Sequence, residues 1–357
     1  MGKWKPLVGR VVLLVVVLTI CLLTLEAMLR MIYGRNGMHF GIEMWKYAKA
    51  LKRSSAIHDL GHEHIPNSEA FLMGVPVKIN SAGLRDREFS LDKPKDTYRI
   101  LALGDSTTFG WGAHQDKTYP KLLEQKLNEK PPAGCPHHFE VINTGVGNYN
   151  TVQEVTYFKE RGRLYKPDMV LIGFFINDAE ETPREQRSWL ARESSLYVFL
   201  GSAYDGLLRL TGGRPNYHDY YNGLYEKDKP GWVRCQQAFH QLIDVCHKEH
   251  IDLRFLLIPE LHTLKPNYEF ETVNDKIRAI AKGANVPVID LLDGCSGQNA
   301  PSLWVSPADD HPNDLACELF AKQLYATLQS TIHCGQDKVT AGGEKDSVRT
   351  APQSSSQ

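Results

Sequence analysis

A short apolar segment, residues 100–103, ends in the triplet Gly104-Asp105-Ser106. A run of this length that stops at a glycine is typical of a buried strand. Residues 119–129 then carry leucines at helical spacing, so a helix is expected to follow. Because ligands bind at the carboxyl ends of strands in open α/β sheets, Ser106 lies where a nucleophile can act. The alternative is that Ser106 is a helix N-cap or turn residue, a position that serine favours.

The same alternation of apolar runs and amphipathic segments continues to the end of the soluble part of the chain. Strands are expected at residues 98–104, 138–145, 168–176, 252–259 and 287–291. Helices are expected at residues 118–129, 151–163, 232–249, 270–284 and 314–331. Alternating strands and helices predict a parallel sheet covered by helices on both faces, which is a three-layer α/β/α sandwich.

Three further segments place polar groups where strands end or loops begin. Residues 143–150 follow the second strand and are rich in glycine and asparagine, and Asn177 ends the third strand. Residues 306–313 contain two acids and His311 just before the last helix. One pocket at the carboxyl edge of one sheet can collect all of these groups.

These segments resemble the four sequence blocks of the SGNH (GDSL-type) hydrolase family. The matching blocks are residues 104–106, 143–150, 177–178 and 309–313, in the family's order, and the resemblance covers residues 97–331. Each block alone is a weak signal, because short motifs recur by chance. The resemblance implies a flavodoxin-like strand order, 2-1-3-4-5, and serine hydrolase chemistry.

The resemblance also implies a role for each block. Ser106 would be the nucleophile and His311 the general base, since a serine hydroxyl needs an adjacent base and imidazole titrates near neutrality. A carboxylate would orient the imidazole. The oxyanion would be held by the backbone N–H of Ser106, a backbone N–H of the second block and the side-chain amide of Asn177.

Two positions depart from the family pattern. Ala308 stands three residues before the histidine, where the family usually has an acid, so Asp309 is the better candidate for the triad acid and Asp310 the alternative. Asn148 stands where the oxyanion loop usually has glycine. Because asparagine tolerates left-handed backbone geometry, a donor at Asn148 is expected, with Gly147 as the alternative.

The N-terminal 30 residues suggest a membrane anchor. Residues 11–25 carry no charge and follow Lys3, Lys5 and Arg10. With their apolar neighbours they approach the roughly 20 residues that span a bilayer, and the basic flank is expected to stay cytoplasmic. No cleavage site of the A-x-A type follows, so an uncleaved signal-anchor is preferred to a removed signal peptide. A buried core helix is the other alternative. The catalytic domain would then be extracytoplasmic, or periplasmic in a bacterium.

We expect the chain to consist of four segments. The first, residues 1–30, contains the basic flank and the anchor. Residues 31–96 are expected to be a juxtamembrane connector with a small extended or hairpin element. Residues 97–334 form the hydrolase domain, with an aromatic-rich insertion at about 180–230. That insertion is either a helical cap with its own core or a substrate lid whose aromatic rings stack on sugars. Residues 335–357 have few apolar side chains and are expected to be a disordered tail.

Composition excludes some classes of function. The 41 basic and 42 acidic residues give a net charge of −1, which offers no footprint for nucleic acid. Six cysteines follow the anchor, so disulfides are possible in an oxidising compartment, but their pairing cannot be read from sequence. No spacing of cysteine and histidine resembles a metal site, and we expect neither a metal nor a cofactor.

The sequence therefore predicts a membrane-anchored serine esterase of the cell envelope that acts on an O-acyl ester. The substrate would be a small-molecule or polysaccharide acyl ester, with lipid esters as the other option. An acyltransferase that acts on envelope or exported polysaccharide would use the same triad. A non-catalytic protein that binds glycan or serves as a scaffold is the alternative from another class. Protein partners cannot be predicted.

Overall fold

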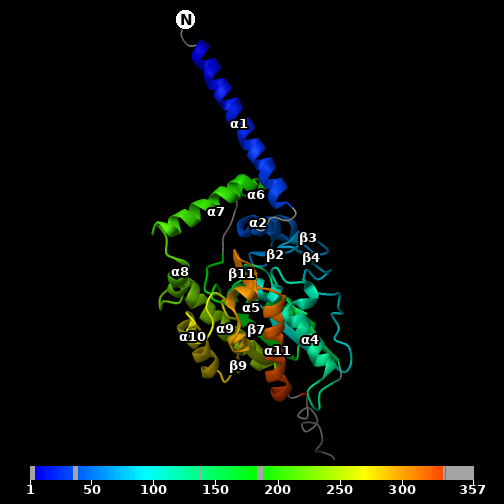
Figure 1. Ribbon diagram of the computed structural model, residues 1–357. Coiled ribbons are helices and arrows are strands. Elements are labelled where there is room, and N and C mark those ends of the chain that lie inside the picture. The colour runs from blue at the N-terminus through cyan, green and yellow to red at the C-terminus, as the bar shows by residue number, and fades with distance from the viewer. Residues whose placement is uncertain (1–4, 35–38, 137, 183–187, 333, 335–357) are drawn as a thin grey trace, which may run out of the picture.

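The structure is a computed structural model that describes residues 5–34, 39–136, 138–182, 188–332 and 334. Residues 1–4 of the expected basic flank and the expected disordered tail, 335–357, lie outside the described residues. Helix α1 (Lys5–Tyr33) projects from a domain that is built around one central sheet (Figure 1).

The central sheet contains five parallel strands in the order β6-β5-β7-β8-β9. The strands are β5 (Thr97–Leu103), β6 (His138–Asn143), β7 (Met169–Phe174), β8 (Asp252–Leu257) and β9 (Val288–Asp290). In chain order this is 2-1-3-4-5, so the flavodoxin-like arrangement is confirmed. The first strand lies between the second and the third, so the segment after β5 leaves the carboxyl edge of the sheet between the ends of β6 and β7, where the strand order reverses.

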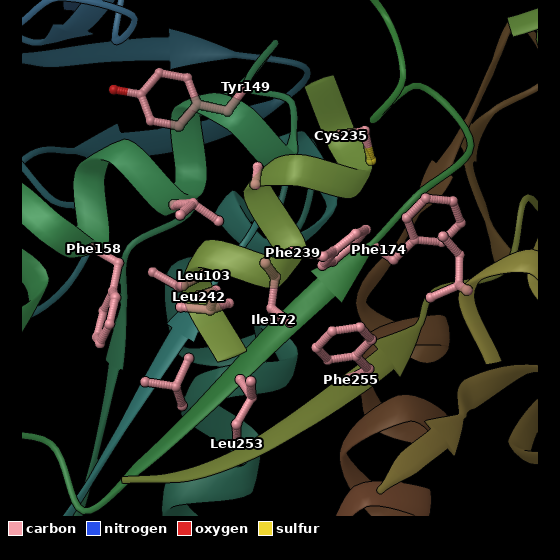
Figure 2. Close-up of a cluster of buried hydrophobic side chains, with 14 of the residues drawn as sticks. Leu103, Tyr149, Phe158, Ile172, Phe174, Cys235, Phe239, Leu242, Leu253 and Phe255 are labelled. Atoms are coloured by element: carbon pink, nitrogen blue, oxygen red, sulfur yellow. The ribbon is translucent and has the colours of Figure 1, made fainter. Parts of the chain in front are cut away.

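Helices cover both faces of the sheet, because side chains alternate between the two faces along each strand. On one face, Leu103, Ile172 and Phe255 pack against α5 (Thr151–Glu160), α9 (Pro230–Glu249) and α10 (Glu271–Gly283). On the other face, strand side chains pack against α4 (Tyr119–Glu129) and α11 (Asp314–Thr331). Figure 2 shows the first core, in which Phe239 and Leu242 of α9 lie over the strands. The three-layer sandwich is therefore confirmed.

The stretch expected to be a connector is folded onto the domain. It contains α2 (Phe40–Leu51), the antiparallel pair β1 (Lys52–Ser54) and β2 (His62–His64), and a hairpin of β3 (Glu69–Leu72) and β4 (Val75–Lys78). Tyr47 and Leu51 of α2 share a small core with residues of the hairpin and with Phe109 and Trp111. This third core holds α2 against the carboxyl edge of the sheet, so residues 40–79 do more than bridge α1 to the domain.

The insertion between β7 and α9 contains helices. They are α6 (Trp189–Glu193), α7 (Ser195–Leu210) and α8 (Tyr217–Leu224). Figure 1 shows α7 running from the foot of α1 across the top of the domain towards α8. The aromatic residues of the insertion differ in exposure: Tyr225 is buried, whereas Trp189, Tyr197 and Tyr204 are exposed.

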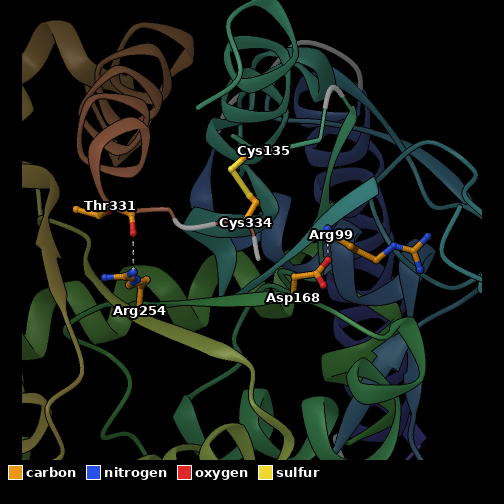
Figure 3. Close-up of a disulfide and its surroundings, with 6 residues drawn as sticks. All are labelled: Arg99, Cys135, Asp168, Arg254, Thr331 and Cys334. Carbon is orange, nitrogen blue, oxygen red and sulfur yellow. Dashed lines mark hydrogen bonds between the residues drawn. A yellow bond between two sulfur atoms is a disulfide. The ribbon is translucent and has the colours of Figure 1, made fainter. Parts of the chain in front are cut away.

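A disulfide joins Cys135, after α4, to Cys334, after α11, with a Cα–Cα distance of 4.8 Å. Figure 3 shows this bond beside two hydrogen bonds, Arg99 N to Asp168 and Arg254 to the carbonyl of Thr331. The disulfide and both hydrogen bonds lie near the amino ends of the strands, at the opposite end of the sheet from Ser106. The disulfide therefore fixes the end of the last helix to the body of the domain.

Candidate active site

The turn after β5 holds Ser106 in a fixed position. Ser106 is the first residue of the short helix α3 (Ser106–Phe109), and Asp105 caps it by accepting a hydrogen bond from the N–H of Thr107 at 2.8 Å. A side chain at Gly104 would lie 2.0 Å from the Thr108 hydroxyl oxygen, so only glycine fits this position. The Gly-Asp-Ser triplet therefore forms a tight exit from the strand, with the serine at the carboxyl edge of the sheet.

A hydrogen-bonded chain connects Ser106 to the loop before α11. The Ser106 Oγ lies 2.9 Å from His311 Nε2, and His311 Nδ1 lies 2.6 Å from Asp309 Oδ1. The second oxygen of Asp309 accepts a hydrogen bond from Trp111 Nε1 at 2.9 Å. Strand β11 (Asp309–Pro312) pairs with β10 (Trp304–Ser306), and this small hairpin delivers both the acid and the imidazole.

The neighbouring acid, Asp310, points elsewhere. Its carboxylate lies 3.4 Å from Nδ1 of His262, and the same nitrogen contacts Glu260. The spacing of two residues puts the side chain of Asp309, rather than Asp310, on the same side of the strand as His311. Of the two candidate acids, the structure brings only Asp309 to the far nitrogen of the imidazole.

The electrostatics of this chain favour an ion pair. Burial alone would lower the pKa of His311, but the Asp309 carboxylate outweighs it and raises that pKa to about 9. Burial likewise opposes ionisation of Asp309, but the charge of His311 and the Trp111 N–H hold the pKa of Asp309 below its usual value. The arrangement stabilises an imidazolium, which is the state that forms when a serine gives up its proton.

Asn177 and the second block surround the same turn. The Asn177 amide donates one hydrogen bond to Asp105 Oδ2 at 3.0 Å, and an amide NH₂ has a second N–H to give. Asn148 adopts left-handed backbone geometry with φ of 66°, the conformation that asparagine tolerates better than most residues. The N–H of Gly147, by contrast, is already bonded to the Tyr47 hydroxyl at 2.9 Å. The bond to Tyr47 competes with any role of the Gly147 N–H as an oxyanion donor. Asn148, the other candidate donor in this loop, does not make this bond.

Four residues around the site carry no signal in a short motif; Tyr47, Trp111 and Arg85 are buried, and Phe40 is exposed. Tyr47 reaches the second block from α2, and the ring of Phe40 stacks on His311 with centroids 5.9 Å apart. Trp111 supports Asp309, and the buried guanidinium of Arg85 donates to the carbonyls of Phe109, Gly110 and Ala113 in the loop that carries Trp111. Their contacts join distant parts of the chain, and only the amphipathic pattern of α2 could have pointed to any of them.

Two buried acids lie beneath the nucleophile turn. Glu154 of α5 and Asp178, just after Asn177, are both fully buried, and burial is the main cause that raises the pKa of each well above its usual value. The charges of Asp178 and Asp105 add to this shift at Glu154, and those of Asp105 and Glu180 add to it at Asp178. Both carboxyl groups therefore favour the neutral form more than exposed acids do.

Among the described residues, two groups of three side chains bring together atoms of the kinds that bind metals, with the atoms of each group within 4.8 Å of one another. One is Glu260, His262 and Asp310, and the other is Asp309, Asp310 and His311. Hydrogen bonds and ion pairs within each group account for this proximity. The side chain of Glu260, at the exit of β8, is buried against His262.

Comparisons with known proteins bear on the whole domain. A profile described as the GDSL-like Lipase/Acylhydrolase family matches residues 102–319. No curated protein matches the sequence. Among solved structures, the lipase/acylhydrolase from Enterococcus faecalis is 16% identical, with coverage of 67% of this chain and 99% of that chain and a TM-score of 0.43. The psychrotrophic esterase EstA from Pseudoalteromonas sp. is also 16% identical, with coverage of 65% and 97% and a TM-score of 0.42.

The family profile spans more than half of the chain and includes both the nucleophile turn and the loop of His311. The sheet order and the position of Ser106 at the carboxyl edge agree with that match. The chain belongs to the GDSL-like lipase/acylhydrolase family and is an enzyme that hydrolyses ester bonds.

Proposed function

We propose that Ser106, His311 and Asp309 form the catalytic triad of this esterase. The observation that carries the proposal is the continuous chain from Ser106 Oγ through His311 to Asp309, at 2.9 and 2.6 Å. These distances lie within the range needed for proton transfer between nucleophile and base.

In the first half of the reaction, Ser106 Oγ attacks the ester carbonyl carbon while its proton moves to His311 Nε2. Backbone N–H groups of Ser106 and Asn148 and the Asn177 amide hold the negative oxygen of the tetrahedral intermediate. Collapse of this intermediate expels the alcohol, which takes the proton from His311. In the second half, water repeats the sequence at the acyl-enzyme and releases the acid.

We also propose that α1 anchors the enzyme in a membrane, with the catalytic domain outside the cytoplasm. Within Leu7–Tyr33 of α1, the most apolar 18-residue stretch has a mean hydropathy of 2.8 and is not buried by the rest of the described chain. By length and composition such a helix can cross a bilayer. The Cys135–Cys334 disulfide supports an oxidising compartment, since disulfides are rare in the cytosol.

The triad is tested with the full-length protein in detergent or nanodiscs. A fluorophosphonate probe, read by intact mass, should label the wild type once, and p-nitrophenyl acetate and butyrate should be hydrolysed. Ser106→Ala should abolish both signals, whereas Ser306→Ala, at a buried serine of the neighbouring β10, should keep them. Labelling that persists in Ser106→Ala would place the nucleophile elsewhere.

Hydrolysis and acyl transfer share this triad and differ in what resolves the acyl-enzyme. Adding a sugar hydroxyl acceptor to the same assay separates the two, because transfer raises the rate of p-nitrophenol release and yields an acylated sugar. Hydrolysis yields only the free acid. We propose hydrolysis as the primary activity, in agreement with the family.

A further inference from the structure

Helix α7 exposes a row of large apolar side chains. The exposed large side chains lie three or four residues apart on one face: Tyr197, Leu200, Tyr204, Leu207 and Leu210. The opposite face is buried or half-buried and mixes apolar with polar side chains: Leu196, Phe199, Ser202, Asp205, Leu208 and Arg209. A surface helix of a soluble domain usually turns a polar face to solvent. A contiguous exposed apolar face of this kind marks an interaction site.

The N-terminal end of α7 is hydrogen-bonded to one turn of α1, at Glu26 and Arg30. The carboxylate of Glu26 accepts hydrogen bonds from the backbone N–H groups of Ser195 and Leu196, at 3.0 and 2.8 Å, and from the Ser194 and Ser195 hydroxyls. On the other side, Arg30 donates to the carbonyl of Glu193 at 2.6 Å. A charged group of the long helix therefore caps α7, and the two helices meet at a defined point.

That point coincides with the expected edge of the bilayer. At 1.5 Å per residue, residues 7–25 of α1 span about 28 Å, close to the roughly 30 Å of a hydrocarbon core. Glu26, the first charged residue after Arg10, then lies at the boundary with the headgroups. Figure 1 shows that α7 leaves α1 from this level and runs across the top of the domain instead of folding down along it.

We propose that α6 and α7 form a membrane-interface helix pair whose outward face lies in the headgroup region of the bilayer that α1 spans. Trp189 of α6 and two tyrosines of α7 belong to that face, and these residue types concentrate at membrane–water interfaces. An amphipathic helix in the plane of the membrane buries its apolar face at this depth. The proposal rests on the proposed anchoring by α1.

Seating α7 on the bilayer would also fix the position of the active site. Helix α2 packs between α7 and the catalytic residues, since Ser202 of α7 lies against Gly41 and the neighbouring Phe40 ring stacks on His311. The catalytic residues then lie behind α2 at a set distance from the membrane surface. Acyl esters presented at that surface, rather than esters free in solution, are the substrates this geometry favours.

The test uses the full chain in phosphatidylcholine nanodiscs and a small fluorophore on one cysteine at a time. Native Cys21 is exposed on α1, whereas the other free cysteines are buried and unreactive in the folded protein. In a Cys21→Ala background, Leu207→Cys reports on α7 and Leu164→Cys is the matched control, because the two leucines are 56% and 59% exposed. Leu164 lies at the end of the domain where β7 begins.

A nitroxide carried on the lipid should quench the labels at Cys21 and Leu207→Cys severalfold more than the label at Leu164→Cys, and aqueous iodide should show the opposite order. If Cys21 is quenched and Leu207→Cys behaves like Leu164→Cys, the interface helix is wrong and the anchor stands. If two copies pack their α7 faces together, the label would be shielded from iodide but not quenched by the lipid, which also overturns the proposal. If Cys21 itself is not quenched, the proposed anchoring fails and the inference falls with it.

Discussion

The hydroxyl of Tyr47 accepts a hydrogen bond from the backbone N–H of Gly147 at 2.9 Å, across 100 residues of sequence. The same hydroxyl contacts His64 Nε2 at 2.7 Å, and the ring is fully buried. A side chain on Gly147 would lie 2.6 Å from this ring. The helix that follows α1 therefore holds the loop that carries Asn148, so the oxyanion loop depends on a segment outside the sheet.

Tyr47→Phe should lower kcat more than it raises KM. The substitution leaves the buried N–H of Gly147 without an acceptor, which costs about 1–3 kcal/mol, and the loop that aims Asn148 loses its fixed position. We expect a fall in kcat of about tenfold or more, which corresponds to roughly 1.4 kcal/mol. Steady-state kinetics on p-nitrophenyl butyrate check this, with Tyr204→Phe on the exposed face of α7 as the control. An unchanged kcat with normal stability would show that Tyr47 does not position the loop.

Asp309→Asn should lower kcat by about 10⁴-fold, because an amide at this position favours the wrong tautomer of His311. Asp310→Asn should change kcat by far less, since its carboxylate faces His262. The pair is a matched control, with the same chemical change at adjacent residues. Similar losses in both variants, at equal thermal stability, would contradict the assignment of Asp309.

The pH profile of kcat/KM should be alkaline. Below its pKa, His311 carries a proton and cannot accept another from Ser106, and that pKa is raised to about 9. Activity should therefore climb as pH rises and level off above about 9. Asp309→Asn removes the carboxylate that raises the pKa of His311 most, so the residual activity should have its acid limb at lower pH. A wild-type limb near 6.5, the ordinary value for histidine, would contradict this.

The raised pKa of His311 also makes stability depend on pH, but stability should fall as pH rises, whereas activity should increase. A folded-state pKa above the unfolded value of about 6.5 means that the folded protein binds the proton more tightly. The contribution of His311 to the free energy of unfolding is therefore complete below about 6.5 and is lost as pH rises through about 9. In His311→Gln this part of the pH dependence should be absent from urea unfolding curves.

Removing the disulfide should lower stability without altering the chemistry. Cys135 and Cys334 are 199 residues apart, so chain-entropy arguments give about 5 kcal/mol as an upper value, and losses of native disulfides usually cost about 2–5 kcal/mol. The double variant Cys135→Ser, Cys334→Ser should unfold at lower urea concentration, and reductant should shift the wild type but leave the variant unchanged. Equal midpoints for both proteins in oxidising buffer would argue against the bond.

Glu154→Gln should be tolerated and Glu154→Ala should not. Burial raises the pKa of Glu154 well above its usual value, so its folded form holds a proton and stability falls as pH rises above about 4.3. Glutamine keeps the volume and removes that titration, so at alkaline pH it should stabilise the protein relative to the wild type. Alanine leaves a cavity and should cost roughly 2 kcal/mol. Thermal unfolding at acidic and alkaline pH separates the two effects.

Much of the fold could be predicted because its signals are local. Each central strand is a buried apolar run bounded by turn residues, and the order of the sheet follows from the family blocks. The carboxyl ends of these strands then collect Ser106, Asn177 and the loop of His311. The left-handed geometry of Asn148 was also predictable, because it is a property of the residue itself.

The rest depends on contacts that no local pattern encodes. The position of Tyr47 against Gly147 is set by how α2 docks, whereas residues 31–96 alone predict only a connector with a small extended or hairpin element. The pairing of Cys135 with Cys334 depends on where α4 and α11 end relative to one another. The choice between Asp309 and Asp310 depends on the pleat of β11, which became visible only with the pairing of that strand to β10.

The disulfide divides the chain into a covalent ring, residues 135–334, and an open arm that precedes it. The ring contains four of the five central strands together with His311 and Asp309, whereas β5 and Ser106 belong to the arm. Since β5 lies between β6 and β7, the arm must thread its strand into the middle of the ring's sheet. The proposed nucleophile and its proposed base thus come from topologically separate parts, and a molecule whose ring has closed without accepting the arm cannot bring Ser106 to His311.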